Sequence, residues 1–222
     1  MPLPTSLGGV RVTFGAVDAP LLAIKDVRVG GSAYQQVTFQ VPYRATAAPR
    51  VVQGEQSAAV PATPAPWGQF IYLGGHLAAQ HAVDYRPVTF ADPPRTGEWI
   101  ILYGDNFGEV VIDLQSGVPA PTDRLVPLST RFLGLDSWKF GLRLDNVVSD
   151  FTLEVGFPGL APGTVGVYQF NVRMPDPLPR GPAWIYMQKI GNCGPATPWP
   201  ICSGLIMDTA VREMTFQFRV AN

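Results

Sequence analysis

The stretch VTFQV, residues 37–41, decides the fold class, because apolar and polar side chains alternate strictly along it. The same alternation recurs in YQFNVR, residues 168–173, and in MTFQFRV, residues 214–220. A period of two residues places one set of side chains on a buried strand face and the other in solvent. One buried face and one wet face are typical of antiparallel sheets packed as a sandwich. These stretches therefore predict an all-β protein.

Other apolar runs of strand length lie between clusters of glycine and proline, which number 23 each. They predict strands over 10–14, 21–24, 70–73, 99–103, 110–114, 140–144, 151–155 and 184–190. The turn signals between them include glycine or proline pairs at 30–31, 74–75, 93–94 and 158–159, and the run 161–163. The best helix candidate, residues 77–83, is too short to be stable alone. So many short strands favour two immunoglobulin-like β-sandwich modules in tandem over one.

The segment QSAAVPATPAP, residues 56–66, is typical of a linker, because alanine, proline and threonine favour extended and poorly packed chain. We therefore predict a first immunoglobulin-like module over 1–60, a linker and connecting hairpin over 61–92, and a second module over 93–222. A short internal repeat supports two modules: residues 37–42 and 168–175 are both alternating strands that stop at a proline.

The 222 residues are 46% hydrophobic and carry a net charge of −1. The chain can thus build packed cores, and its charge favours neither nucleic acid nor an anionic membrane as a partner. No stretch reaches the roughly 18 apolar residues that a membrane span needs. The first residues have no basic region followed by an apolar one, so no signal peptide is expected. Either the protein is cytosolic or the chain is a fragment of a longer protein, and we favour the fragment.

A family resemblance supports that preference. Residues 4–13, 19–22 and 37–43, together with GEWIILYG at 97–104 and GLAPGTVGVYQFNVR at 159–173, resemble an uncharacterised C-terminal domain family. Its members end large secreted proteins of Solibacter-type acidobacteria. The resemblance covers most of the chain and is weak from about 130 to 155. It implies modules similar to immunoglobulin-like TIG folds, an extracellular or cell-surface setting, and no catalytic residues.

The first module departs from the family pattern. The opening strand that the second module has at residues 97–104 has no counterpart before Leu3. We therefore expect the first module to lack that strand and to expose an open sheet edge. An open edge recruits extended segments, so self-association of the chain is expected there, unless residues 51–60 fold back or upstream residues cover the edge. The alternative is a sandwich that is stable with one strand fewer.

The residues that could carry chemistry do not form a known pattern. His76 and His81 are five apart and no glutamate follows His76, so a site of these two with Asp84 lacks the spacing of a zinc protease. The carboxylates Glu98, Asp113 and Glu154 are candidates for the two catalytic carboxylates of a glycosidase, but no sequence pattern supports that role. We expect no enzyme, no bound metal and no cofactor.

Residues 103–108 resemble the G-x-N-F-G turn of TIG domains. Asp105, Asn106, Glu109 and Asp113 could be imagined as calcium ligands, but their spacing differs from that of an EF-hand. A structural interpretation is better, because asparagine tolerates the left-handed conformation and Gly104 and Gly108 bracket a tight turn.

Two further features concern the C-terminal part. Cys193 and Cys202 flank a proline-rich loop between two predicted strands, and in an oxidising compartment we expect them to form a disulfide. Trp199 lies within that loop, where an exposed indole could contact a ligand, or could instead fold back onto its own module. The other strand aromatics are expected in the core; they are Trp99, Trp138, Trp184, Tyr186 and Phe216.

Two functions remain. The first is a non-catalytic structural or adhesive module at the C-terminus of a large secreted or surface protein, with a protein or glycan partner. The second is a carbohydrate-binding accessory module that uses exposed aromatic side chains such as Trp199. Several solvent-facing aromatics in a row would favour the second.

Overall fold

The computed structural model describes residues 1–43, 45–61, 69–73, 76–89, 91–108, 110–129, 138–144, 147–178, 181–189 and 216–218. Throughout these residues the regular structure is β-strand, and all paired strands are antiparallel. The predicted all-β class is therefore confirmed. In the same residues, no helix is long and apolar enough to cross a membrane.

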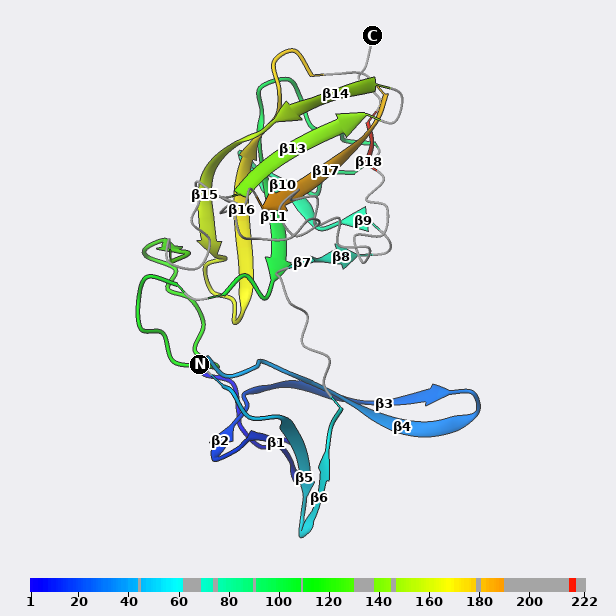
Figure 1. Cartoon of the computed structure of the whole chain (residues 1–222), viewed down its shortest axis with the longest axis vertical. Coiled ribbons are helices and arrows are strands. Elements are labelled where there is room, and N and C mark those ends of the chain that lie inside the picture. Colours follow the sequence, from blue (N-terminus) through cyan, green and yellow to red (C-terminus); the bar gives the residue numbers. More distant parts are fainter. Residues whose placement is uncertain are drawn as a thin grey trace, which may run out of the picture. The chain divides into compact units, whose positions relative to one another are not determined.

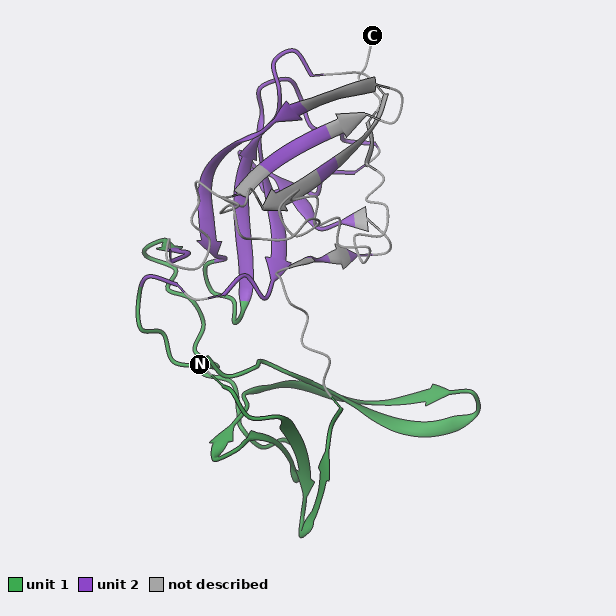
Figure 2. Ribbon diagram, in the orientation of Figure 1, with its two compact units in different colours: residues 1–66, 112–126, 162–166 green, residues 67–111, 127–161, 167–222 purple. Residues whose placement is uncertain are grey.

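The chain divides into two compact units (Figure 2). Unit 1 comprises residues 1–66, 112–126 and 162–166, and unit 2 comprises 67–111, 127–161 and 167–222. Unit 1 thus includes two segments that come late in the sequence. Four short strands of unit 2 lie in the segment predicted to connect the modules; they are Gln69–Phe70, Tyr72–Leu73, His76–Leu77 and Ala79–His81.

Unit 1 contains a four-stranded sheet of order β2-β1-β5-β6 (Figure 1). Its strands are β1 (Val10–Phe14), β2 (Val17–Asp18), β5 (Pro49–Gln53) and β6 (Gln56–Ala59). In β1 the alternate residues Val10, Val12 and Phe14 are buried, as the period of two predicts. The outer edge of β1 is covered within the chain: β2 pairs with its last two residues, and the Ala19 amide donates to the Val12 carbonyl.

A long hairpin extends from this sheet (Figure 1). It consists of β3 (Leu21–Val29) and β4 (Ser32–Phe39), and Gly30 and Gly31 form its turn with φ values of 57° and 86°. Only glycine adopts such positive φ values readily, so the predicted turn is confirmed. The base of the hairpin packs against unit 1 through Leu21, Val37 and Phe39, which join a core that also contains Val12, Phe14 and Ala19.

The late segment 112–126 is fastened to the start of the chain by hydrogen bonds within unit 1. The Leu3 amide donates to the Gly117 carbonyl over 2.8 Å, and the Gly117 amide donates to Gln40 Oε1 over 2.6 Å. A Cβ at position 117 would lie 2.8 Å from the Pro20 ring, and φ there is +82°. Both the space and the backbone conformation therefore require glycine.

Unit 2 has two larger sheets that face each other, so it is a β-sandwich. The first has the order β10-β11-β16-β15-β12, with β7 also pairing with β11, and the second has the order β14-β13-β17-β18. The strands of the first are β7 (Gln69–Phe70), β10 (Ala79–His81), β11 (Trp99–Asp105), β12 (Val126–Pro127), β15 (Glu154–Leu160) and β16 (Val167–Arg173). Those of the second are β13 (Trp138–Leu144), β14 (Val147–Thr152), β17 (Gly181–Lys189) and β18 (Phe216–Phe218). A small separate pair contains β8 (Tyr72–Leu73) and β9 (His76–Leu77).

Aromatic rings fill the space between these sheets. The ring of Phe170 on β16 lies 4.5 Å from that of Phe107, 5.2 Å from that of Phe140 on β13, and 6.0 Å from that of Phe70 on β7. Tilted and edge-on contacts of this kind are favourable beyond the area they bury. The core of unit 2 is thus centred on Phe170, which is 1% exposed.

Several local predictions are wrong. Residues 110–114 do not form a strand, because only Val110 makes a bridge, to Leu128. Gln56–Ala59, assigned to the linker, form β6, which pairs with β5. Within the helix candidate, Ala79–His81 form β10. Pro158 and Gly159 lie inside β15 and do not form a turn. Residues 56–59, 79–81 and 158–159 form strands because a neighbouring strand pairs with them. Residues 110–114 lack such a partner strand within the described residues. Local composition does not reveal either outcome.

Candidate functional site

The first candidate site is a cluster of charged side chains around His81, at one end of the unit 2 sandwich. His81 ends β10 and pairs with Ile100 of β11, so its side chain faces inward with that of Ile100 and is 1% exposed. Glu98 comes just before β11, and the connection from 82 to 98 supplies the remaining members. They are Asp84, Arg86, Asp92 and Arg95.

Both ring nitrogens of His81 have acceptors. Nδ1 lies 2.7 Å from Glu98 Oε1, and Nε2 lies 3.3 Å from the Asp92 backbone carbonyl and 3.5 Å from Asp92 Oδ2. The imidazole ring is therefore held between Glu98 and Asp92, with a polar contact at each of its nitrogens.

The arginines complete the cluster toward solvent. Arg86 Nη1 lies 2.8 Å from Asp92 Oδ2, and Arg95 donates its backbone amide to Glu98 Oε2 over 2.7 Å. Arg86 Nε also donates to Asp84 Oδ2 over 2.6 Å, which lowers the pKa of Asp84 below its usual value. These bonds tie the connection from 82 to 98 to the end of the sheet. Because His81 is buried and bonded on both sides, the cluster is suited to holding this loop.

The structure separates most of the carboxylate and histidine candidates. His81 bonds Glu98 and Asp92, whereas Asp84 pairs with Arg86, so the His81–Asp84 part of the imagined metal site is not formed. His76 lies on β9. Across the described residues, no group of three or more His, Cys, Asp or Glu side chains is arranged to hold a metal ion. Glu154 pairs with Arg173 at 3.5 Å, and both side chains are exposed.

The turn at residues 105–108 matches its structural interpretation. Asn106 has φ 59° and Gly108 has φ 97°, both in the left-handed region. Gly104, predicted to bracket the turn, instead lies within β11, so that part of the prediction is wrong. Glu109 lies outside the described residues. Asp113 belongs to unit 1, whereas Asp105 and Asn106 belong to unit 2.

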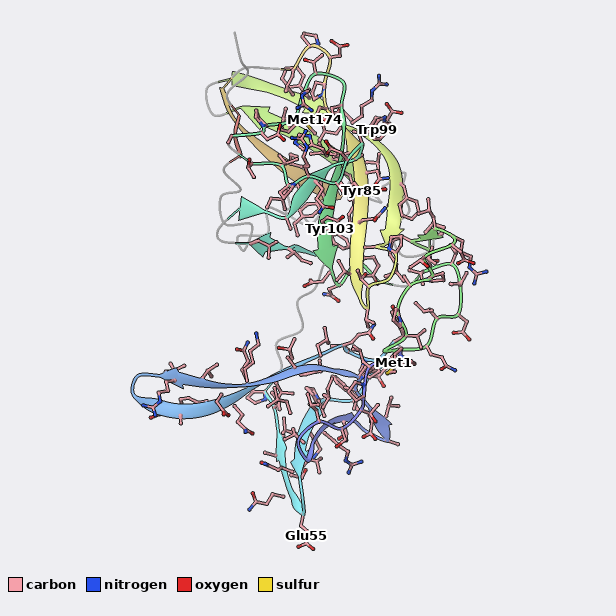
Figure 3. All side chains as sticks on the ribbon, turned by 180° about the vertical axis from the view of Figure 1, so that it is seen from behind. Met1, Glu55, Tyr85, Trp99, Tyr103 and Met174 are labelled. Atoms are coloured by element: carbon pink, nitrogen blue, oxygen red, sulfur yellow. The ribbon has the colours of Figure 1, made fainter. Side chains whose placement is uncertain are left out.

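The second candidate site is the outer face of the β10-β11-β16-β15 sheet. Ile100 and Leu102 of β11 are fully buried in the sandwich, so Trp99 and Tyr103 point to the opposite face, about 13 Å apart at strand spacing. Both are half-buried, and the prediction that Trp99 is a core residue is wrong. Figure 3, which views the molecule from behind, labels both residues together with Tyr85. Tyr85 is 63% exposed.

Amide side chains from the neighbouring strands surround these aromatics. In the register of the sheet, Gln169 lies opposite Tyr103, and Asn171 lies opposite Ile101 on the same face. The Tyr103 hydroxyl donates to Gln80 Oε1 over 2.7 Å, and Gln169 Nε2 donates to Asn171 Oδ1 over 3.4 Å. Burial, together with the nearby Tyr85, raises the pKa of Tyr103, so its hydroxyl remains a donor in neutral solution.

Trp99 is held firmly in this face. A Cβ at position 156 of β15 would lie 2.9 Å from Cζ3 and Cη2 of the indole, so the ring packs directly on the Gly156 backbone. A glycine inside a strand often marks such a close approach. The result is a face on which two partly buried aromatic rings flank Ile101 on one strand, with amide groups beside them; Ile101 and Gln169 on this face are only 4% and 8% exposed.

Three predicted site residues near the C-terminus lie outside the described residues: Cys193, Trp199 and Cys202. Of the strand aromatics, Trp138 lies on β13, Trp184 and Tyr186 on β17, and Phe216 on β18.

The disulfide therefore stays a prediction. Titration of the unfolded and unreduced protein is expected to find no free thiol, and closing the loop is expected to stabilise the fold by about 2.7 kcal/mol in the chain-entropy treatment. Finding two free thiols would contradict the pairing of Cys193 with Cys202.

Comparisons with known proteins identify no relative of this chain. No protein-family model matches the chain, and neither a curated protein nor a solved structure matches it. The resemblance to the acidobacterial domain family, and the tandem immunoglobulin-like relation of the modules, therefore remain predictions from the sequence.

Proposed function

We propose that this chain is a non-catalytic structural or adhesive module that works outside the cell or at its surface, as the C-terminal part of a larger protein. The observation that carries the proposal is the β3–β4 hairpin, which we call the arm and define as residues 21–39. Beyond its base most residues of the arm are exposed, and it presents Val29 and Tyr34 to solvent. A rigid spacer needs no such element, whereas a contact element does.

The charged cluster supports a non-catalytic role. His81 and Glu98 are the most buried of its ionisable side chains, at 1% and 10% exposure, and they are bonded to each other. A catalytic base must be able to reach the proton that it removes. In this cluster the ring nitrogens face acceptors within the protein, and the ion pairs hold a loop in place.

Attachment of coated beads tests the adhesive role. Beads that carry the full chain are expected to attach to a surface that carries the same chain or an extracellular polysaccharide, and not to an albumin-coated surface. Replacing Val29 and Tyr34 with serine removes apolar side chains that are 65% and 55% exposed, so the fold should persist while attachment falls severalfold.

The matched control replaces Val17 and Leu125 with serine, because these are 51% and 55% exposed and belong to unit 1 outside the arm. The control should attach as well as the wild type. Equal losses in the two variants, or attachment to none of the surfaces by the wild type, would refute the adhesive role of the arm.

A second function, a carbohydrate-binding accessory module, is favoured by one observation: Trp99 and Tyr103 lie on one sheet face with Gln80, Gln169 and Asn171. Aromatic faces stack on the apolar faces of sugar rings, while amides bond the hydroxyl groups. Trp199 remains a further candidate for such contacts.

Isothermal titration against soluble neutral oligosaccharides tests this second function. If the outer face binds sugar, Trp99→Ala and Tyr103→Ala should each weaken binding about tenfold, the equivalent of about 1.4 kcal/mol. Tyr34→Ala removes an exposed aromatic from unit 1 and should leave binding unchanged. Failure of every oligosaccharide to bind the wild type would contradict the carbohydrate-binding function.

A further inference from the structure

The outer edge of β4 is an open sheet edge. β4 pairs with β3 along its whole length, from Ser32 opposite Val29 to Phe39 opposite Leu21. In the described part of the chain no strand pairs with its other side. In an antiparallel strand, alternate residues direct their amide and carbonyl groups to each side, so β4 presents a row of hydrogen-bonding groups to solvent.

The two edges of the arm differ in composition. β3 carries Lys25, Asp26 and Arg28 in its middle, and charges of this kind discourage pairing with another strand. β4, with the sequence SAYQQVTF, has no charged residue, no proline and no glycine. It is eight residues long, and its first five residues, 32–36, are exposed. Of the two edges, β4 is therefore the one that lacks every common protection against strand addition.

We infer that β4 pairs with β4 of a second copy of this chain, antiparallel across a two-fold axis, to form a four-stranded sheet of order β3-β4-β4-β3. This inference rests on the proposed adhesive function and names the partner of the arm. A two-fold contact of this kind is self-complementary and closed, so it yields a dimer. Strand addition of this type obtains its affinity mainly from backbone hydrogen bonds.

Charge favours a second copy as the occupant. When a strand pairs with a copy of itself, every charge on it is present twice at the seam, and like charges that lie opposite or diagonal to each other are destabilising. β4 has no charge to repel. The nearest charges, on β3, would be three strand spacings from those on the other β3, or about 14 Å. That distance exceeds the screening length of about 8 Å at physiological ionic strength.

Stability points the same way. A two-stranded hairpin is only marginally stable alone in water, whereas a four-stranded sheet with an apolar face can be stable on its own. Val27 lies opposite Tyr34, and Val29 lies on the same face two residues along. A two-fold axis perpendicular to the sheet keeps these side chains of both copies on one face. Pairing would thus give each arm a neighbour and extend its apolar face.

Sedimentation velocity of the full chain over a concentration series tests the inference. The seam variant carries Ala33→Glu and Gln36→Glu, which place carboxylates on β4 opposite Arg28 and Lys25 of β3. Opposite charges across the hairpin support its fold, whereas the same carboxylates repel their copies in a β4–β4 pair. The dissociation constant of the dimer is expected to rise at least about tenfold, because like-charge juxtaposition in an interface is costly.

The matched control carries Ala58→Glu and Ala59→Glu on β6, which is exposed along its length and receives the same change in net charge. The control should dimerise like the wild type. A wild type that stays monomeric up to its solubility limit, or seam and control variants that dimerise equally, would overturn the inference. If beads still attach to polysaccharide through the arm while the chain is monomeric, the adhesive function stands and only the partner is wrong.

Discussion

Replacing Phe170 with alanine is expected to lower the free energy of unfolding by about 3–5 kcal/mol, the usual cost of removing a buried phenylalanine ring. Phe170 is 1% exposed and its ring contacts those of Phe70, Phe107 and Phe140, which come from both sheets of unit 2 and from the turn after β11. Removing the ring leaves a cavity that rigid neighbours cannot fill. Urea unfolding followed by tryptophan fluorescence measures the change.

The control for this experiment is Phe170→Leu, which keeps most of the apolar volume and should cost much less than the alanine variant. If the two substitutions have equal and small effects, then Phe170 is not the centre of the unit 2 core. An unchanged unfolding midpoint for Phe170→Ala would contradict the face-to-face packing of the two sheets.

Replacing His81 with leucine is expected to lower the free energy of unfolding by about 1–3 kcal/mol, because the buried Glu98 carboxylate loses its imidazole partner and keeps only Arg95. Leucine fills much of the same space but donates no hydrogen bond. Glu98, which is 10% exposed, would then lose its 2.7 Å contact to Nδ1 of the ring. Thermal and urea unfolding at neutral pH measure the loss.

Two further variants distinguish the charge from the packing. Adding Glu98→Gln to His81→Leu removes the carboxylate that has lost its imidazole partner, so the double variant should recover part of the lost stability. Asp84→Asn changes an exposed member of the same cluster and should leave the unfolding midpoint almost unchanged. If the double variant is no more stable than His81→Leu alone, the ion pair is not what holds the loop.

The strands could be predicted where one face is buried and the other wet. Val10–Phe14 shows this clearly, since its burial alternates and its bounds match the prediction. Residues 110–114 show where strand prediction from apolar content fails. They have the apolar content of a strand, yet only Val110 makes a bridge. Residues 112–126 belong instead to unit 1, and a strand needs a partner that local composition does not specify.

The candidate sites were harder to predict. Residues 99–103 are all apolar, so periodicity cannot tell which side chains face outward; the pairing with β16 decides that Trp99 and Tyr103 do. The charged cluster does leave a signal, because Asp84, Arg86, Asp92, Arg95 and Glu98 alternate in sign along one loop. His81 joins them only because β10 pairs with β11.

The open edge was expected in the first module, at the place of its missing opening strand. The structure puts β2 on one side of β1 and β5 (Pro49–Gln53) on the other, so most of residues 51–60 fold back into the sheet, as one alternative expected. Among the described strands of unit 1, β4 and the short β6 have no partner on their outer sides. Sequence could show that SAYQQVTF lacks charge and proline, but not that β3 would be its only partner among the described strands. Edge and centre positions depend on the order of strands in a sheet, and short-range patterns do not encode that order.

Amide hydrogen exchange in residues 21–39 tests the adhesive account most directly. The measurement compares the free chain at low concentration with the chain bound to other copies of itself on beads. We predict that exchange slows on attachment in 32–39, where outward-facing amides of β4 acquire acceptors, and stays the same in 167–173 of unit 2. Protection confined to unit 2, with unchanged exchange in the arm, would contradict the account.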